Sequence, residues 1–222
     1  MSSRHGYFLI PLALAWGASL AAAEAPLEVS FAAADGGTVF AHLYEAGPEG
    51  VILAHGGVFD KESWTDLAGR LRRAGLTVLA IDFRGYGKSG PAKGRAGLEN
   101  DLLGALTYLS KSGLEPLSIV GGSMGAAAAM RAAVAAEPAT INRLVLLAPP
   151  PTGVAGDLHA QHVLFAVSAG DRFRSSVEHD FELAGEDKRL EVLPGDAHAQ
   201  HVFATEHGER LARLIVGFLT EE

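Results

Sequence analysis

The chain has 222 residues, of which 48% are hydrophobic and 20% charged, which is the composition of one globular domain and excludes a disordered or low-complexity segment. Its 26 acidic and 18 basic residues give a formal charge of -8, and no basic run marks a surface for nucleic acid, which we do not expect as a partner. Because the chain has no cysteine, disulfides, thiolate nucleophiles and cysteine-bound metals are excluded, and a nucleophile must be an oxygen or a nitrogen.

The first 23 residues have the pattern of a secretory signal peptide. A short polar start with one cation, residues 1–5, precedes an apolar stretch, residues 6–23, that ends in alanines. Cleavage after Ala23 or after Ala25 satisfies the small-residue rule equally well. An uncleaved membrane anchor is the alternative, because the apolar stretch reaches the lower limit for a spanning helix. We favour cleavage, and therefore expect residues 24–222 to be an exported domain, periplasmic or secreted, without stable membrane association.

The rest of the chain alternates short apolar runs with segments of helix length. Residues 29–33 and 38–44 flank an Asp-Gly-Gly turn at 35–37 and predict an N-terminal β-hairpin. The apolar runs that follow are rich in β-branched residues and mostly lack alternation, as strands buried on both faces do. These predicted strands are residues 51–54, 77–81, 117–120, 144–147, 163–167 and 190–193. Helices are expected over residues 61–74, 94–112, 124–136, 175–184 and 203–219.

This order of elements predicts the α/β class. Repeated strand, helix and strand units form a mostly parallel, twisted sheet with helices on both faces. No linker, repeat or change in composition divides residues 24–222, so we expect a single domain. Ligands of such sheets bind outside the carboxyl ends of the strands, and the residues that follow the predicted strands are therefore the candidates for a site.

Residues 121–125, Gly-Gly-Ser-Met-Gly, follow one predicted strand and precede a predicted helix. They match the pattern Gly-x-Ser-x-Gly, in which glycines let the strand and the helix approach and the serine occupies a tight turn. The hydroxyl of Ser123 would then stand at a helix N-terminus, where developing negative charge is stabilised. An ordinary serine cap of the helix is the alternative. The context of strand, turn and helix favours the nucleophile.

Two later strand ends supply an acid and a base for this serine. Asp171 lies just past the predicted strand 163–167, and His198 lies in the loop before the last predicted helix. The chain order Ser123, Asp171, His198 is a known order of nucleophile, acid and base. Asp196 competes for the acid role, but it lies two residues from His198 on one short loop, from which the far ring nitrogen is awkward to reach. We therefore favour Asp171.

Donors for a developing oxyanion are expected directly after an early strand, where the chain reads His55-Gly56-Gly57-Val58. Glycines there allow backbone N–H groups to turn inward. We predict that Gly57 and Met124, the residue after the serine, provide the two oxyanion donors. A glycine-rich turn without that role is the plainer interpretation, and the two are compatible. We expect His55 to brace this loop by hydrogen bonding and not to act as a base.

Together these motifs resemble the α/β-hydrolase superfamily over about residues 27–220. The resemblance rests on His55-Gly56-Gly57 with Trp64, on residues 82–89 (Asp-Phe-Arg-Gly-Tyr-Gly-Lys-Ser), on residues 121–125, and on Asp171 and His198. Within the superfamily the chain is similar to small serine esterases of the dienelactone-hydrolase-like and CCG1-interacting-factor-B-like kind. The resemblance implies the α/β-hydrolase fold, with Asp82 and Arg84 in structural roles.

The residue at position 123 narrows what the resemblance implies about activity. Dienelactone hydrolases proper use cysteine there, and the dehalogenases and epoxide hydrolases of the superfamily use aspartate. Ser123 therefore favours ordinary ester hydrolysis.

Many members of the superfamily insert a helical cap between the strands that correspond here to residues 144–147 and 163–167. Only residues 148–162 lie between these two strands, and they begin with a stiff run of prolines at 149–151. We therefore predict no cap domain and an open cleft beside Phe59, Met124 and the proline loop.

A metal site is not expected. His159 and His162 have the spacing of a helical metal-binding pair, but the sequence offers no third ligand and continues into a predicted strand. We expect a solvated histidine pair, and neither a metal nor a cofactor.

The sequence thus predicts an exported serine hydrolase that cleaves carboxylic esters or thioesters of small molecules through an acyl-enzyme. Ser123 attacks, His198 moves the protons and Asp171 orients the imidazole. The alternative is a non-catalytic binding or scaffold protein on the same fold, because a fold does not by itself determine function. The presence of all three side chains argues against that alternative.

Overall fold

The structure, a computed structural model, describes residues 25–91 and 97–221. The predicted signal peptide, residues 1–23, lies outside the described residues. Within them the chain forms an eight-stranded sheet with the order β1-β2-β4-β3-β5-β6-β7-β8. The strands are β1 Leu27–Ala32, β2 Thr38–Tyr44, β3 Gly50–Ala54, β4 Thr77–Ile81, β5 Leu117–Gly122, β6 Ile141–Leu147, β7 His162–Ser168 and β8 Lys188–Leu193.

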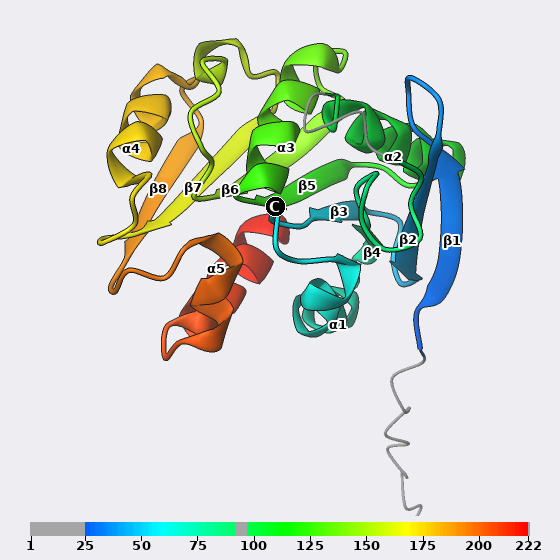
Figure 1. Cartoon of the computed structure of the whole chain (residues 1–222), viewed down its shortest axis with the longest axis horizontal. Helices are drawn as coiled ribbons and strands as arrows, with labels where there is room; N and C mark the ends of the chain where they lie inside the picture. Colours follow the sequence, from blue (N-terminus) through cyan, green and yellow to red (C-terminus); the bar gives the residue numbers. More distant parts are fainter. Residues whose placement is uncertain (1–24, 92–96, 222) are drawn as a thin grey trace, which may run out of the picture.

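Helices cover both faces of this sheet (Figure 1). Helices α2, α3 and α4 lie over one face, and α1 and α5 lie over the other. The α-helices are α1 Thr65–Arg73, α2 Glu99–Lys111, α3 Met124–Ala135, α4 Arg174–Leu183 and α5 Gly208–Leu219. The described residues also form three short 3-10 helices, η1 Lys61–Trp64, η2 Ala155–Asp157 and η3 Ala199–Ala204. The prediction of an α/β fold with helices on both faces is confirmed.

The strands pair in two ways, antiparallel at the β1 edge of the sheet and parallel elsewhere. Strands β1 and β2 form the predicted antiparallel hairpin, β2 pairs antiparallel with β4, and all later pairs are parallel. Every residue of β3, β4 and β5 is buried, because helices cover both faces of the sheet. Strands buried on both faces need apolar residues on both, and this explains why the three sequences show little alternation. The sheet is therefore mostly parallel, as predicted.

The last helix differs from its prediction. Apolar residues predict a helix over 203–219, but α5 begins at Gly208, and the chain before it forms η3. Thr205 has an extended backbone with φ of -104° and ψ of 173°, which ends η3. The chain then folds so closely on itself that a Cβ at position 208 would overlap the backbone of Phe203. A glycine is required at that contact, and the helix starts there.

No cap domain covers the carboxyl ends of the strands in the described part of the chain. The connection from β6 to β7 is a loop that contains η2 as its one short helix. This agrees with the prediction from the proline run at 149–151. None of the helices in the described ranges is long and apolar enough to cross a membrane.

Arg84 and Asp101 form a buried ion pair that joins the hairpin, the loop after β4 and helix α2. The Arg84 Nε donates to Asp101 Oδ1 at 2.5 Å, and the Arg84 backbone N–H donates to Oδ2 at 2.8 Å. The guanidinium also donates to the Gly36 carbonyl at 2.9 Å and pairs with Asp35 at 2.8 Å. The Asp101 side chain is fully buried. Arg84 thus has the structural role that the resemblance implies.

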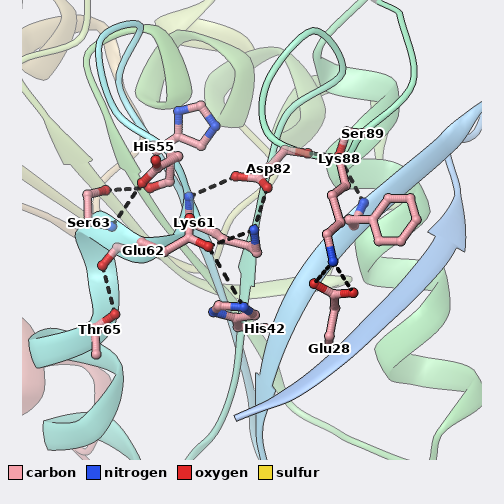
Figure 2. A network of polar contacts seen from close by, with 12 residues as sticks. Glu28, His42, His55, Lys61, Glu62, Ser63, Thr65, Asp82, Lys88 and Ser89 are labelled. Atoms are coloured by element: carbon pink, nitrogen blue, oxygen red, sulfur yellow. Dashed lines mark hydrogen bonds and ion pairs between the residues drawn. The ribbon is translucent and has the colours of Figure 1, made fainter. Parts of the chain in front are cut away.

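We expect Asp101→Ala to lower the free energy of unfolding by about 3–5 kcal/mol, because it leaves most of the Arg84 guanidinium buried without its closest carboxylate. Urea denaturation measures this change. Glu28→Ala is the control, because it removes the partner of Lys88 from an exposed ion pair (Figure 2). A urea midpoint that moves equally for both variants would contradict the structural role of the buried pair.

Asp82, the residue after β4, anchors the start of η1. Its buried carboxylate accepts the Lys61 backbone N–H at 2.9 Å and the Lys61 ammonium at 2.7 Å. Figure 2 shows the Lys61 ammonium between Asp82 and Glu62, which it contacts at 2.9 Å. The segment between β3 and η1, which contains the glycines at 56 and 57, is therefore fixed at both ends.

Candidate active site

The loops after β3 and β5 meet at a topological switch point of the sheet. The chain passes from β3 to β4 on one side, and it later returns to place β5 on the other side of β3. A crevice forms at the carboxyl ends of two strands whose connections run in opposite directions. His55, Gly56 and Gly57 follow β3, and Ser123 follows β5. The predicted oxyanion loop and the predicted nucleophile therefore lie side by side.

Ser123 occupies a sharp turn between β5 and α3. Its backbone angles are φ 49° and ψ -109°, outside the regions that non-glycine residues commonly adopt. The end of β3 lies so close to α3 that a Cβ at position 125 would overlap the Ala54 carbonyl oxygen. The second glycine of Gly-x-Ser-x-Gly is therefore required by packing, and the serine side chain stands at the mouth of the crevice.

The structure brings Ser123, His198 and Asp171 together. His198 Nε2 lies 2.8 Å from Ser123 Oγ, and His198 Nδ1 lies 2.7 Å from Asp171 Oδ2. The Asp171 side chain is fully buried, and its other oxygen accepts the Phe173 backbone N–H at 2.8 Å. Asp196, the competing acid, is exposed. The carboxylate that contacts the imidazole is Asp171.

Parallel pairing of β7 and β8 explains why the Asp171 and His198 loops are adjacent. The two strands end side by side, with Ser168 opposite Leu193. Beyond the strands the loops remain joined, because Ser168 Oγ donates to the Ala197 carbonyl at 2.6 Å. The ring of Phe173 packs edge-on against the imidazole of His198, with the two ring centroids 5.5 Å apart. The imidazole is therefore held by its neighbours in a fixed orientation.

His55 braces the loop after β3. The Phe83 backbone N–H donates to His55 Nε2 at 3.2 Å, so this nitrogen carries no proton and Nδ1 donates to the Gly56 carbonyl at 2.8 Å. Burial lowers the pKa of His55, which favours this neutral form. The carbonyl and the N–H of one trans peptide point in opposite directions. By holding the Gly56 carbonyl, His55 therefore directs the Gly57 N–H to the other side of the peptide.

Two cavities meet at Ser123 and Met124. One, of about 560 Å³, contains His198 and is lined by the loop after β3, with Gly57 and Phe59 among its residues. The other, of about 500 Å³, lies over α3 and is lined by Leu98, Ala127, Ala128, Arg131, Pro150, Arg172 and Phe173. Phe59, Met124 and the proline loop all border this space, as the sequence predicts.

Gln200 is a residue of this site that the sequence analysis did not identify. The residue is 5% exposed, and its side chain lies beside the loop after β3. No motif marks it, because it follows His198 by two residues, in the segment that the sequence predicts as the loop before the last helix. The one sequence signal is the glycine at the x position of the motif, Gly122, whose neighbour in space is Gln200.

The histidines with metal-like spacing contact different partners. His159 Nδ1 lies 3.0 Å from the Ala136 carbonyl, and His162 Nδ1 lies 2.6 Å from Asp187. Residues 25–91 and 97–221 hold no group of three or more histidine, aspartate or glutamate side chains arranged for a metal ion.

The site therefore consists of a serine, a histidine and a buried carboxylate that are joined by hydrogen bonds at the carboxyl ends of a mostly parallel sheet. This arrangement is typical of α/β proteins whose site is built around a serine. The chain belongs to the family described as the alpha/beta hydrolase fold, which matches residues 50–202.

One relative by sequence and two by structure illustrate what this chain is similar to. A Mycobacterium tuberculosis protein described as uncharacterized is 29% identical over 189 residues, which cover 73% of this chain and 67% of that protein. The Pyrococcus furiosus esterase Pf2001 superposes with a TM-score of 0.75 at 19% identity, covering 87% of this chain and 91% of the esterase. A predicted CIB-like hydrolase from Thermoplasma acidophilum gives 0.72 at 22% identity, covering 87% and 98%. The sequence-based resemblance to the superfamily and to its CIB-like members is confirmed.

Proposed function

We propose that this protein is an exported serine hydrolase that cleaves carboxylic esters or thioesters through an acyl-enzyme. The observation that carries the proposal is the unbroken chain of hydrogen bonds from Asp171 through His198 to Ser123. Serine is a weak nucleophile until a base accepts its proton, and a third group must orient that base. The esterase named among the similar structures supports the same chemistry.

In the first half of the reaction, Ser123 Oγ attacks the carbonyl carbon while His198 Nε2 takes its proton. The buried Asp171 carboxylate stabilises the imidazolium that forms. The tetrahedral intermediate collapses when the bond to the alcohol or thiol breaks, and His198 gives its proton to that leaving group. An acyl group then remains on Ser123.

In the second half, His198 takes a proton from water as the water oxygen attacks the acyl carbon. The bond to Ser123 breaks, Oγ regains its proton from His198 and the carboxylic acid leaves. Both tetrahedral intermediates carry an oxyanion, for which we propose the backbone N–H groups of Gly57 and Met124. Met124 opens helix α3, where the helix dipole adds positive potential.

The two cavities suggest where the parts of the ester bind. His198 must reach the leaving oxygen or sulfur, and it lines the cavity beside Phe59 and Gly57. The alcohol or thiol therefore belongs in that cavity. The acyl group belongs in the other, where Ala127 and Ala128 form part of an open wall.

A fluorophosphonate probe tests this proposal directly, because it labels only an activated serine. We expect labelling of the intact protein at Ser123, located by mass spectrometry, together with turnover of some members of a panel of acyl esters and thioesters. Labelling at another serine would move the site. No labelling and no turnover would favour the non-catalytic alternative.

Export is a separate part of the proposal and is supported by the sequence of residues 1–23. N-terminal sequencing of the protein recovered from the periplasm or the medium should begin at Glu24 or Pro26. A full-length chain found in the membrane fraction would contradict it.

The absence of a cap domain leads to a prediction about substrates. Activity should rise smoothly with ester concentration through the point where aggregates form, because no helical lid must open. Long acyl chains should gain little over short ones, since an open groove buries few methylenes and each fully buried one contributes only about 0.8 kcal/mol. Initial rates on p-nitrophenyl esters of increasing length measure both effects. Sharp interfacial activation with a strong long-chain preference would contradict an uncapped site.

A further inference from the structure

The side-chain amide of Gln200 is buried against the loop that contains Gly57. Its Oε1 accepts the Gly56 backbone N–H at 2.6 Å, and its Nε2 donates to Ser63 Oγ at 2.9 Å. Because the Ser63 hydroxyl donates to the Asp60 carbonyl, it is free to accept from Nε2. This sets the orientation of the amide, with its oxygen toward Gly56.

Gln200 also occupies the space beside the residue that precedes Ser123. A Cβ at position 122 would lie 2.9 Å from Gln200 Oε1 and 3.1 Å from its Cγ. The glutamine therefore fills the volume that a side chain at the x position of Gly-x-Ser-x-Gly would need. Through this contact and the Gly56 bond, it touches the end of β5 and the loop after β3 at once.

The backbone at the start of η3 directs the side chains of His198 and Gln200 to the same site. Ala199, between them, has φ of +48°, in the left-handed region that few non-glycine residues adopt. His198 reaches Ser123, and Gln200 reaches Gly56. The next residue, His201, packs its ring on Phe59 at 4.9 Å. Residues 198–201 thus join the imidazole to the loop that contains Gly57.

We propose that Gln200 is a positioning residue that aligns the oxyanion donor Gly57 with the Ser123 and His198 pair. Gln200 holds the N–H of Gly56 and His55 holds its carbonyl, so the peptide that presents the Gly57 N–H cannot rotate. Because the Gly56 N–H already donates to Gln200 Oε1, it does not donate to the oxyanion in place of the Gly57 N–H. This inference rests on the proposed ester hydrolysis, and it assigns to Gln200 no contact with the substrate.

Three variants separate positioning from general stability. Gln200→Leu removes both hydrogen bonds but keeps most of the bulk. Gln200→Glu keeps an oxygen for the Gly56 N–H, so that amide should still exchange slowly, but the added negative charge opposes the oxyanion and should not restore kcat. Gln161→Leu is the matched control, because Gln161 is exposed and precedes β7, at the end of the parallel strands opposite the site.

We expect Gln200→Leu to lower kcat about 10- to 100-fold with KM within about twofold, since losing one oxyanion donor outright costs about 10²- to 10³-fold. The specific readout is the pKa of the hemiketal oxygen in a trifluoromethyl ketone adduct on Ser123, followed by ¹³C NMR. That pKa should rise in Gln200→Leu and stay unchanged in Gln161→Leu. A folded Gln200→Leu with unchanged kcat, or with lower kcat and an unchanged adduct pKa, would overturn the proposal.

Hydrogen exchange keeps this test separate from the proposed function. In the wild-type protein the amides of residues 55–59 should exchange more slowly than in Gln200→Leu, whether or not any ester is hydrolysed. Gly122→Ala should speed the same exchange by displacing the glutamine. Equal exchange rates of these amides in the wild type, Gln200→Leu and Gly122→Ala would overturn the Gln200 contact. Lack of ester turnover in the wild type, with slow exchange intact, would instead contradict the proposed function.

Discussion

Ser123→Ala should lower kcat for an activated ester by about 10⁴-fold or more, because it removes the atom that attacks the carbonyl. The substitution leaves the sharp turn and the packing of Gly125 against β3 in place, so the fold should persist. Initial rates with a short-chain p-nitrophenyl ester measure the loss, and circular dichroism with thermal unfolding checks the fold.

Ser110→Ala is the control for this variant, because Ser110 is an exposed serine of α2. Its rates should equal those of the wild type. A folded Ser123→Ala protein that retained full turnover would refute the serine mechanism and direct attention to another nucleophile.

Asp171→Asn should reduce turnover by about 10⁴-fold, the known scale for the acid of such a triad. The amide cannot support the imidazolium, and its donor group would favour the wrong histidine tautomer. Asp171 Oδ1 is held by the Phe173 N–H, so the residue at 171 has little freedom to adjust. Comparison of kcat in the two proteins at several pH values measures the effect.

Asp196→Asn is the matched comparison, because it makes the same chemical change in the adjacent loop. Asp196 is exposed, and the His198 Nδ1 that it would need is already taken by Asp171. We expect a small effect on kcat. The opposite ranking of the two variants would transfer the acid role to Asp196.

Patterns that are local in sequence predicted most of the fold. The unbroken apolar strands, the Asp-Gly-Gly hairpin turn and the Gly-x-Ser-x-Gly turn each report on a backbone conformation within a few residues. The prediction for the start of the last helix was wrong, because the break at Thr205 depends on how residues 203 and 208 pack together. Apolar periodicity does not contain that information.

Contacts between distant residues could not be predicted in the same way. The acceptor of the Gly56 N–H is a glutamine 144 positions along the chain, and the partner of Asp82 is a lysine 21 positions earlier, at the start of η1. Neither pair has a spacing that chemistry requires. By contrast, Asp171 and His198 each follow a predicted strand, and the parallel order of the sheet determines that such residues converge.

The strained backbone conformation of Ser123 lowers the stability of the fold at the same residue that the proposed activity requires. A non-glycine residue at φ 49° and ψ -109° costs of the order of 1–3 kcal/mol, which the packing of β5 and α3 must offset. Glycine would adopt these angles with less strain, so a protein that only bound a ligand would fold more stably with glycine there. A strained serine is useful to a hydrolase, whose attacking oxygen must project from the turn. Some stability is thus given up at Ser123 in favour of chemistry, and variants selected for heat resistance alone should lose activity first at this position.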